Sequence, residues 1–163
     1  IRCREYGHRS RDGWEIGEPH MVRMDYEASG GKEIFLSFED ENETLFGLLR
    51  MRIQSKPIIL LGKKIEGNLA LIRELHIYGP EVSLKQRNPT AAQHKGLGKA
   101  LLMEAERIAA NVFQAQQMVV LSGTGAKEYY RSEFGYRSQG DYMVKHLGQV
   151  PKADPRPFQP APV

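Results

Sequence analysis

The segment from Gln93 to Ala100 combines residue types and spacings that could bind an anion. Gly96 and Gly98 stand one residue apart, directly before a stretch with the periodicity of an amphipathic helix. Its apolar residues are Leu97, Leu101, Ala105, Ile108 and Val112, and the polar residues on its other side are Lys99, Glu106 and Arg107. The first amides of a helix lack acceptors within it, and glycine lets the backbone approach a phosphate closely. The pattern therefore predicts a site for a phosphorylated ligand.

The spacing of these residues narrows the choice of ligand. A nucleotide P-loop needs Ser or Thr directly after the lysine, but Ala100 follows Lys99. A dinucleotide-binding fingerprint needs a third glycine where Leu101 stands. The remaining pattern, Gln/Arg-x-x-Gly-x-Gly/Ala, resembles the pyrophosphate loop of the acetyl-CoA-dependent N-acetyltransferases of the GNAT class. The alternative is an ordinary loop-to-helix turn that binds nothing.

Composition and length limit the classes of protein to consider. The chain has 163 residues, 40% hydrophobic and 26% charged, which is typical of one soluble domain. No apolar run reaches membrane-spanning length, so we expect no membrane partner. Cys3 is the only cysteine, which excludes an internal disulfide and a cysteine-ligated cluster and fits a cytoplasmic location. Because the chain begins at Ile1 rather than Met, we expect it to be a segment of a longer protein.

Basic residues crowd the start of the chain. The net charge is only +3 with a pI near 9.0, which permits a nucleic-acid partner without requiring one. The crowded residues are Arg2, Arg4, His8, Arg9 and Arg11. They form either a solvated extension or a contact strip for phosphates or for a neighbouring domain.

The order of expected elements defines the fold class. We expect residues 1–20 to be an irregular basic extension or interdomain segment, residues 21–147 to be the folded domain, and residues 148–163 to be a disordered Pro-rich tail. Within the domain, we expect a turn over 62–68, helices over residues 21–29, 97–112 and 126–134, and strands over 33–38, 45–53, 57–61, 69–78, 118–121 and 142–145. This order is α+β with one crossover, and it matches the GNAT plan.

Several motifs together resemble one family more specifically. They are residues 2–5, 25–31 and 142–145, and the segments Arg73-Glu74-Leu75-His76-Ile77-Tyr78-Gly79, Gln93-His94-Lys95-Gly96-Leu97-Gly98, Ser122-Gly123-Thr124-Gly125 and Glu128-Tyr129-Tyr130-Arg131. Over residues 1–147 the chain is similar to the C-terminal acetyltransferase domain of the Elongator catalytic subunit and its archaeal and bacterial relatives. The resemblance implies a GNAT fold, with a mixed, mostly antiparallel sheet, a splayed parallel pair of strands and flanking helices.

The resemblance also implies a function. Enzymes of this family modify tRNA by placing a carboxymethyl group at C5 of the wobble uridine, and acetyl-CoA supplies the carbon unit. S-adenosylmethionine and a [4Fe-4S] cluster belong to an N-terminal radical domain, which is absent from this chain. The implied partners are tRNA, that radical domain and, in eukaryotes, other Elongator subunits. Two alternatives are a free-standing N-acetyltransferase for a protein lysine or small amine, and an RNA-binding module that has lost the cofactor.

The same resemblance assigns residues that would hold the cofactor. The pantetheine arm would pair with the backbone of Glu74, Leu75, His76 and Ile77 as an extra strand. The pyrophosphate would meet the amides of Lys95, Gly96, Leu97, Gly98, Lys99 and Ala100, near the ammonium of Lys95 or Lys99. Gln93 would brace this loop.

Two tyrosines and one glutamate are the candidate catalytic residues. Tyr130 is the candidate at the thioester, where its hydroxyl would protonate the departing thiolate. Tyr129 is the alternative, because Tyr130 stands five residues before Gly135 and GNAT chains usually have four. Core packing is the competing explanation for the pair. Glu74 would act as general base or position a water, and an ion pair with Arg73 or another base is its alternative.

Two histidines near the predicted cofactor site are candidates for a structural or a binding role. We expect His76 to be a half-buried sheet residue and His94 to lie in a loop near phosphate or tRNA. Neither has the spaced carboxylates or cysteines of a metal site, so we expect no structural metal.

Overall fold

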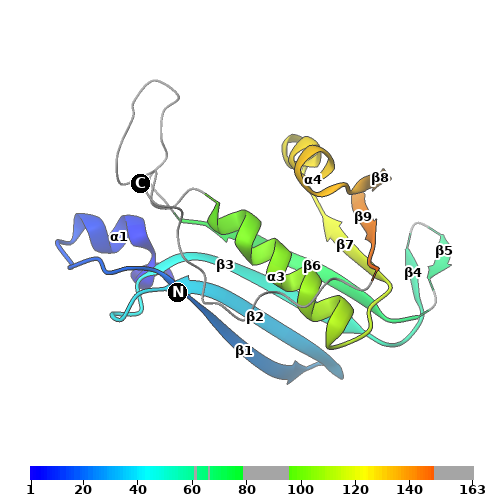
Figure 1. Ribbon diagram of the computed structural model, residues 1–163, viewed down its shortest axis with the longest axis horizontal. Coiled ribbons are helices and arrows are strands. Elements are labelled where there is room, and N and C mark those ends of the chain that lie inside the picture. Colours follow the sequence, from blue (N-terminus) through cyan, green and yellow to red (C-terminus); the bar gives the residue numbers. More distant parts are fainter. Residues whose placement is uncertain (61, 66, 79–95, 149–163) are drawn as a thin grey trace.

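A seven-stranded mixed sheet forms the centre of the computed structural model, which describes residues 1–60, 62–65, 67–78 and 96–148 (Figure 1). The strand order is β1-β2-β3-β6-β7-β9-β8. These strands are β1 (His20–Ala28), β2 (Gly31–Glu39), β3 (Leu45–Gln54), β6 (Leu69–Ile77), β7 (Gln117–Leu121), β8 (Arg137–Gln139) and β9 (Tyr142–His146). The other elements are η1 (Arg2–Arg4), α1 (Tyr6–Arg11), β4 (Ile58–Leu60), β5 (Lys63–Ile65), α3 (Leu97–Asn111), η2 (Thr124–Ala126) and α4 (Lys127–Phe134).

The predicted α+β class is confirmed. β6 and β7 pair in parallel, and the other pairs of adjacent strands are antiparallel. Helix α3 lies between β6 and β7 in sequence and crosses one face of the sheet (Figure 1). Its large side chains at Leu101, Leu102 and Ile108 are fully buried and belong to the same core cluster as Ile34 and Leu49 of the sheet. Burying each such side chain stabilises the fold by about 1.5–3 kcal/mol.

The predicted helix over residues 21–29 is wrong, because this segment is strand β1. It pairs with β2 along its whole length, from His20 opposite Glu39 to Ala28 opposite Gly31. The connecting turn has two residues, Ser29 and Gly30, and both have positive φ angles (51° and 70°). Such a turn follows the natural twist of a hairpin. Pairing with a non-local strand therefore decides the structure of a segment whose local pattern is ambiguous.

The first residues are also more ordered than the sequence predicts. Residues 6–11 form α1, and the buried ring of Tyr6 lies 5.5 Å from the ring of Phe46. Arg9 is buried, donates to the carbonyl oxygen of Asn42 and to Thr44 Oγ1, and stacks over Trp14.

Several side chains of the N-terminal basic cluster therefore form contacts within the protein. Arg4 forms an ion pair with Glu39, and Arg11 donates to the carbonyl oxygen of Gly7. A wholly solvated extension is thus excluded for Arg4 and Arg9. Whether a domain boundary falls near residue 20 stays a prediction.

Two short strands lie where the sequence predicts none. β5 lies in the predicted turn over residues 62–68 and pairs with β4 in a separate two-stranded sheet. β8 pairs with β9 through a turn that contains Gly140 with a φ of 63°. Strands of three residues are too short to show a period, so only their pairing reveals them.

Glu106 does not face solvent, in contrast to its expected side of the helix. It is only 7% exposed, and its carboxylate accepts from the Tyr136 hydroxyl at 2.9 Å and from Lys145 Nζ at 2.8 Å. The two contacts tie α3 to the β8–β9 end of the sheet. A buried carboxylate requires such partners, since an unpaired one would be costly to desolvate.

Two further expectations concern the whole chain. Among the residues that the structure describes, no helix has the length and apolar character needed to cross a membrane. The predicted Pro-rich tail over 148–163 lies, except for Gly148, outside the described residues.

Candidate functional site

The parallel strands β6 and β7 separate part of the way along the sheet. They pair from Leu69 opposite Gln117 to Ile72 opposite Val120, and the pairing ends there. β6 continues to Ile77, held on its other side by β3. The edge of residues 73–77 that faces β7 therefore has no strand partner among the described residues. An extended ligand could pair with it as an added strand.

A β-bulge marks the point where the strands separate. Met51 of β3 pairs with Ile72 and Arg50 pairs with Glu74, so Arg73 is the extra residue. Gly47 lies further along β3, where a Cβ would come within 2.7 Å of Ile77 Cδ1 and 3.1 Å of the carbonyl oxygen of His76. Glycine at this position therefore allows β3 and β6 to approach closely beside the gap. No local sequence pattern distinguishes Gly47, so its role becomes visible only in the folded structure.

The ion pairs around Glu74 differ from the pairing first considered. Arg73 Nη1 lies 3.0 Å from Glu33 Oε1, which also accepts from Arg52 Nη1 at 2.9 Å. Glu74 Oε2 instead lies 3.5 Å from Arg50 Nη1. The side chain of Glu74 is 41% exposed, so this pair contributes little to stability and leaves the carboxylate accessible.

Alternate residues of β6 lie on opposite faces of the sheet. Leu75 packs against the core cluster on the α3 face. Glu74 and His76 lie on the other face. His76 is exposed rather than half-buried as expected, and its ring stacks on Tyr78 with 4.6 Å between centroids.

Helix α3 begins at the end of the sheet where the gap lies. Gly96 is its N-cap with a φ of 93°, and no side chain caps the helix or places a carboxylate in its first turn. A Cβ on Gly98 would meet Ile77 Cγ1 at 3.5 Å and the Tyr129 hydroxyl at 3.6 Å, which are ordinary contacts. Protein packing therefore does not require glycine at position 98. A ligand that approaches the backbone there would explain it, as a phosphate at a helix N-terminus does.

The structure separates the two tyrosines of α4. Tyr129 is 40% exposed, and its hydroxyl lies near Gly98 at the start of α3. Tyr130 is 6% exposed, and its ring packs edge-on against Tyr129 and Tyr136 in the core. Burial raises the pKa of Tyr129 above its ordinary value, and the negative charge of Glu133 raises it further. Its hydroxyl therefore keeps its proton at neutral pH.

The structure describes only some of the remaining candidate residues. Gln93, His94 and Lys95 lie outside the described residues. Lys99 is exposed and Ala100 is partly buried, both in the first turn of α3. Within the described ranges, no group of three or more His, Cys, Asp or Glu side chains is arranged to hold a metal ion.

The strand order, the separated parallel pair and the helix that opens with glycine define the GNAT acetyltransferase fold. No protein-family model matches the chain. Sequence comparison finds 55% identity over 147 residues with a tRNA uridine(34) acetyltransferase of Dehalococcoides mccartyi, which covers 90% of this chain and 32% of that protein. It also finds 44% identity over 153 residues with Elongator complex protein 3 of Mus musculus, which covers 90% of this chain and 27% of the relative.

A solved structure agrees with these relatives. The archaeal Methanocaldococcus infernus Elp3 superimposes with a TM-score of 0.72 at 44% identity, covering 90% of this chain and 35% of that one. Over 90% of its length the chain is a homologue of part of the proteins named tRNA uridine(34) acetyltransferase and Elongator complex protein 3. It spans about a third of the length of these relatives.

Proposed function

We propose that this chain is the acetyl-CoA-binding and acetyl-CoA-hydrolysing part of an enzyme that places a carboxymethyl group at C5 of the wobble uridine of tRNA. The relatives that carry the name tRNA uridine(34) acetyltransferase support the choice of substrate. A radical S-adenosylmethionine domain with its [4Fe-4S] cluster would lie outside this chain, which has one cysteine. Its other partners would be tRNA and, in eukaryotes, the remaining Elongator subunits.

One observation carries the proposal. The unpaired edge of β6, the uncapped start of α3 and the Tyr129 hydroxyl converge at one end of the sheet. Ile77 and Tyr129 both reach Gly98, so strand, helix and tyrosine surround the same space. Backbone groups for a pantetheine amide, helix amides for a pyrophosphate and a proton donor are thereby available together. The residues present fit acetyl-CoA.

Different groups of the site would have different roles in the hydrolysis of acetyl-CoA. When bound, acetyl-CoA supplies an acetyl group activated as a thioester. The amides at the start of α3 would donate to the pyrophosphate, and Tyr129 Oη would hold a proton for the departing sulfur. A carboxylate oxygen of Glu74 would accept a proton from the attacking water. Glu74 lies on the face of the sheet away from Leu75 and the core cluster, whereas Tyr129 lies beside the start of α3, so the two would act from opposite sides of the sheet.

Calorimetric titration of the complete protein with acetyl-CoA tests the first half of the proposal. We expect saturable one-to-one binding. Hydrolysis of the thioester, measured with tRNA and with the same tRNA carrying cytidine at the wobble position, tests the second half. We expect faster turnover with the uridine-containing tRNA.

Two other results would overturn the proposal. Absence of acetyl-CoA binding would indicate an RNA-binding module that has lost its cofactor. Acetylation of a lysine peptide or small amine without tRNA would indicate a free-standing N-acetyltransferase.

A further inference from the structure

A pocket rich in basic side chains lies beside the β8–β9 hairpin. This hairpin lies on the same side of the molecule as β4 and β5 (Figure 1). The volume of the pocket is about 590 Å³. Four of its lining residues are basic: Lys63 of β5, Arg137 of β8, and Lys145 and His146 of β9. No Asp or Glu lines it. We call these four residues and the space between them the basic pocket.

Arg137 differs from the other arginines of the folded domain. Every other described arginine after residue 11 has a carboxylate within 4 Å: Arg23, Arg50, Arg52, Arg73, Arg107 and Arg131. Within the described ranges, neither Arg137 nor Lys63 has such a partner. The pocket therefore holds two positive charges that the described part of the protein does not neutralise.

The other side of the basic pocket is held in place. Lys145 Nζ is fixed by Glu106 Oε2 at 2.8 Å and lies 5.6 Å from the Tyr136 ring centroid. Ser138, another lining residue, accepts from Arg131 Nη2 at 3.1 Å. Because Glu106 neutralises Lys145, the excess charge comes from Lys63 and Arg137. A wall fixed in this way loses little conformational entropy when a ligand binds.

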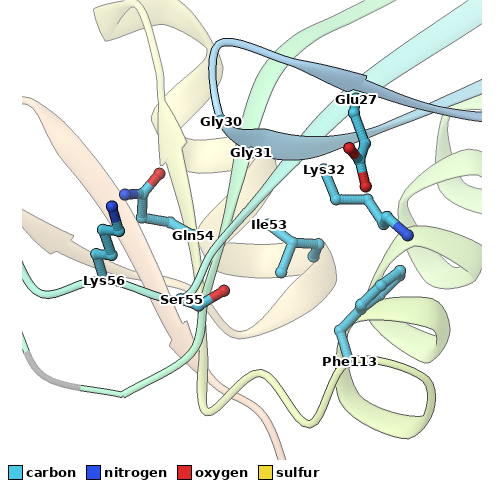
Figure 2. Close-up of a pocket in the computed structure, with 9 residues that line it drawn as sticks. All are labelled: Glu27, Gly30, Gly31, Lys32, Ile53, Gln54, Ser55, Lys56 and Phe113. Atoms are coloured by element: carbon cyan, nitrogen blue, oxygen red, sulfur yellow. The ribbon is translucent and has the colours of Figure 1, made fainter.

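A second pocket provides a contrast. Figure 2 shows Lys32 and Lys56 at a pocket of about 380 Å³ near the β1–β2 turn. Glu27 also lines it, and Lys32 lies 5.9 Å from the ring centroid of Phe113. This pocket has as many lysines or arginines without an ion pair as the basic pocket, but it includes a carboxylate.

We infer that the basic pocket binds the phosphate backbone of an RNA strand. This inference rests on the proposed function, which supplies tRNA as the substrate. Arg137 offers a planar group with several donors to a phosphate, and Lys63 offers a mobile ammonium. Contacts to the backbone would position the RNA without reading its sequence.

The position of the basic pocket suits a tRNA substrate. Tyr129, near the start of α4, reaches Gly98, and Phe134 and Gly135 at its end line the basic pocket. Eight helical residues span about 12 Å, so an RNA strand in the pocket would lie near the cofactor gap.

The test compares two double variants of the complete protein that each remove two positive charges. Lys63→Gln with Arg137→Gln removes the uncompensated charges of the basic pocket. Lys32→Gln with Lys56→Gln is the matched control at the other pocket. Binding of tRNA is measured by fluorescence anisotropy over a range of salt concentrations, and acetyl-CoA binding and thermal unfolding are measured on the same proteins.

We expect the first variant to bind tRNA about 10-fold more weakly at low salt. The negative slope of log K against log salt should become shallower by about 1.5. The control should keep the slope of the unaltered protein. Both variants should keep the affinity for acetyl-CoA and the unfolding temperature.

An unchanged slope in the first variant, or equal losses in both variants, would overturn the inference. Binding of inorganic phosphate is measured on the same proteins by calorimetry. Loss of phosphate binding with unchanged tRNA binding in the first variant would also overturn the inference, because the pocket would then bind a small anion. The unaltered protein could fail to bind acetyl-CoA while the first variant still shows a shallower salt slope than the unaltered protein. In that case the proposed function fails and the RNA contact stands.

Discussion

The hydroxyl of Tyr129 lies 3.6 Å from the position that a Cβ would take on Gly98. The two residues belong to different helices, α4 and α3, which meet beside the end of β6. Tyr130 instead packs in the core, against Tyr129 and Tyr136. We therefore propose Tyr129, the alternative in the sequence-based hypothesis, as the proton donor.

Gly98→Ala should weaken acetyl-CoA binding without destabilising the protein. The added methyl group meets only ordinary contacts in the protein, and alanine favours a helix by about 1 kcal/mol relative to glycine. We expect unchanged or higher unfolding temperature and at least a roughly 10-fold lower affinity, because the methyl group stands where a phosphate would approach. Thermal unfolding and calorimetric titration measure the two effects.

Gly96→Ala is the comparison for this variant. Its Cβ would have open space, but its φ of 93° strains any other residue, so stability should fall by about 1 kcal/mol or more. If Gly98→Ala binds acetyl-CoA as tightly as the unaltered protein, no phosphate lies against this turn.

Tyr129→Phe should slow acetyl-CoA hydrolysis more than Tyr130→Phe. Removing a general acid costs roughly 100-fold in turnover, whereas Tyr130 lies in the core and reaches no reacting group in this assignment. The KM for acetyl-CoA should change little in either variant. Steady-state kinetics of the complete protein with tRNA measures both. Equal losses, or a larger loss for Tyr130→Phe, would contradict the assignment.

Glu74→Gln should lower turnover by about 100-fold and leave the protein folded, since the amide keeps the shape of the side chain but cannot accept a proton. Arg50→Gln is the control, because it removes the ion pair while keeping the carboxylate. If the role of Glu74 is only the ion pair, the two variants should lose equal activity. Hydrolysis rates at saturating acetyl-CoA decide between these outcomes.

Asp40 should make stability depend on pH in the acid range. Burial alone raises the pKa of its carboxyl, but the backbone amides of Gly17, Thr44 and Asn42 and the Thr44 side chain outweigh this and lower the pKa below its ordinary value of 3.8. The carboxylate therefore stabilises the fold above that value, and the stabilisation is lost as pH falls through the lower folded pKa.

Asp40→Asn should accordingly lower the free energy of unfolding by about 1–3 kcal/mol at pH 7. The difference from the unaltered protein should shrink as the pH falls below about 4, where the unaltered carboxylate also takes up a proton. Urea unfolding at several pH values measures it. Asp12→Asn, at an exposed position, should change neither quantity, and a constant difference at all pH values would refute the explanation.

The sequence predicted those features that local patterns determine. The periodicity after Gly98 predicts α3, and the apolar composition of the segments that form β3 and β6 predicts strands. Gly135 ends α4 with a φ of 73°, as its residue type predicts. Each of these features depends on residues that are close in sequence, so the local pattern is sufficient to predict it.

The tertiary structure decided which side chains meet. Strand β1 forms because β2 lies beside it, and Glu106 is buried because Tyr136 and Lys145 come from distant segments. Only the packing of α4 distinguishes Tyr129 from Tyr130, since the two neighbours have the same type and the same local pattern. The cations of the basic pocket likewise come together only when two hairpins fold side by side. Contacts between distant segments are absent from a local pattern. Residue types therefore suggest the chemistry of the proposed site, and the fold alone decides its geometry.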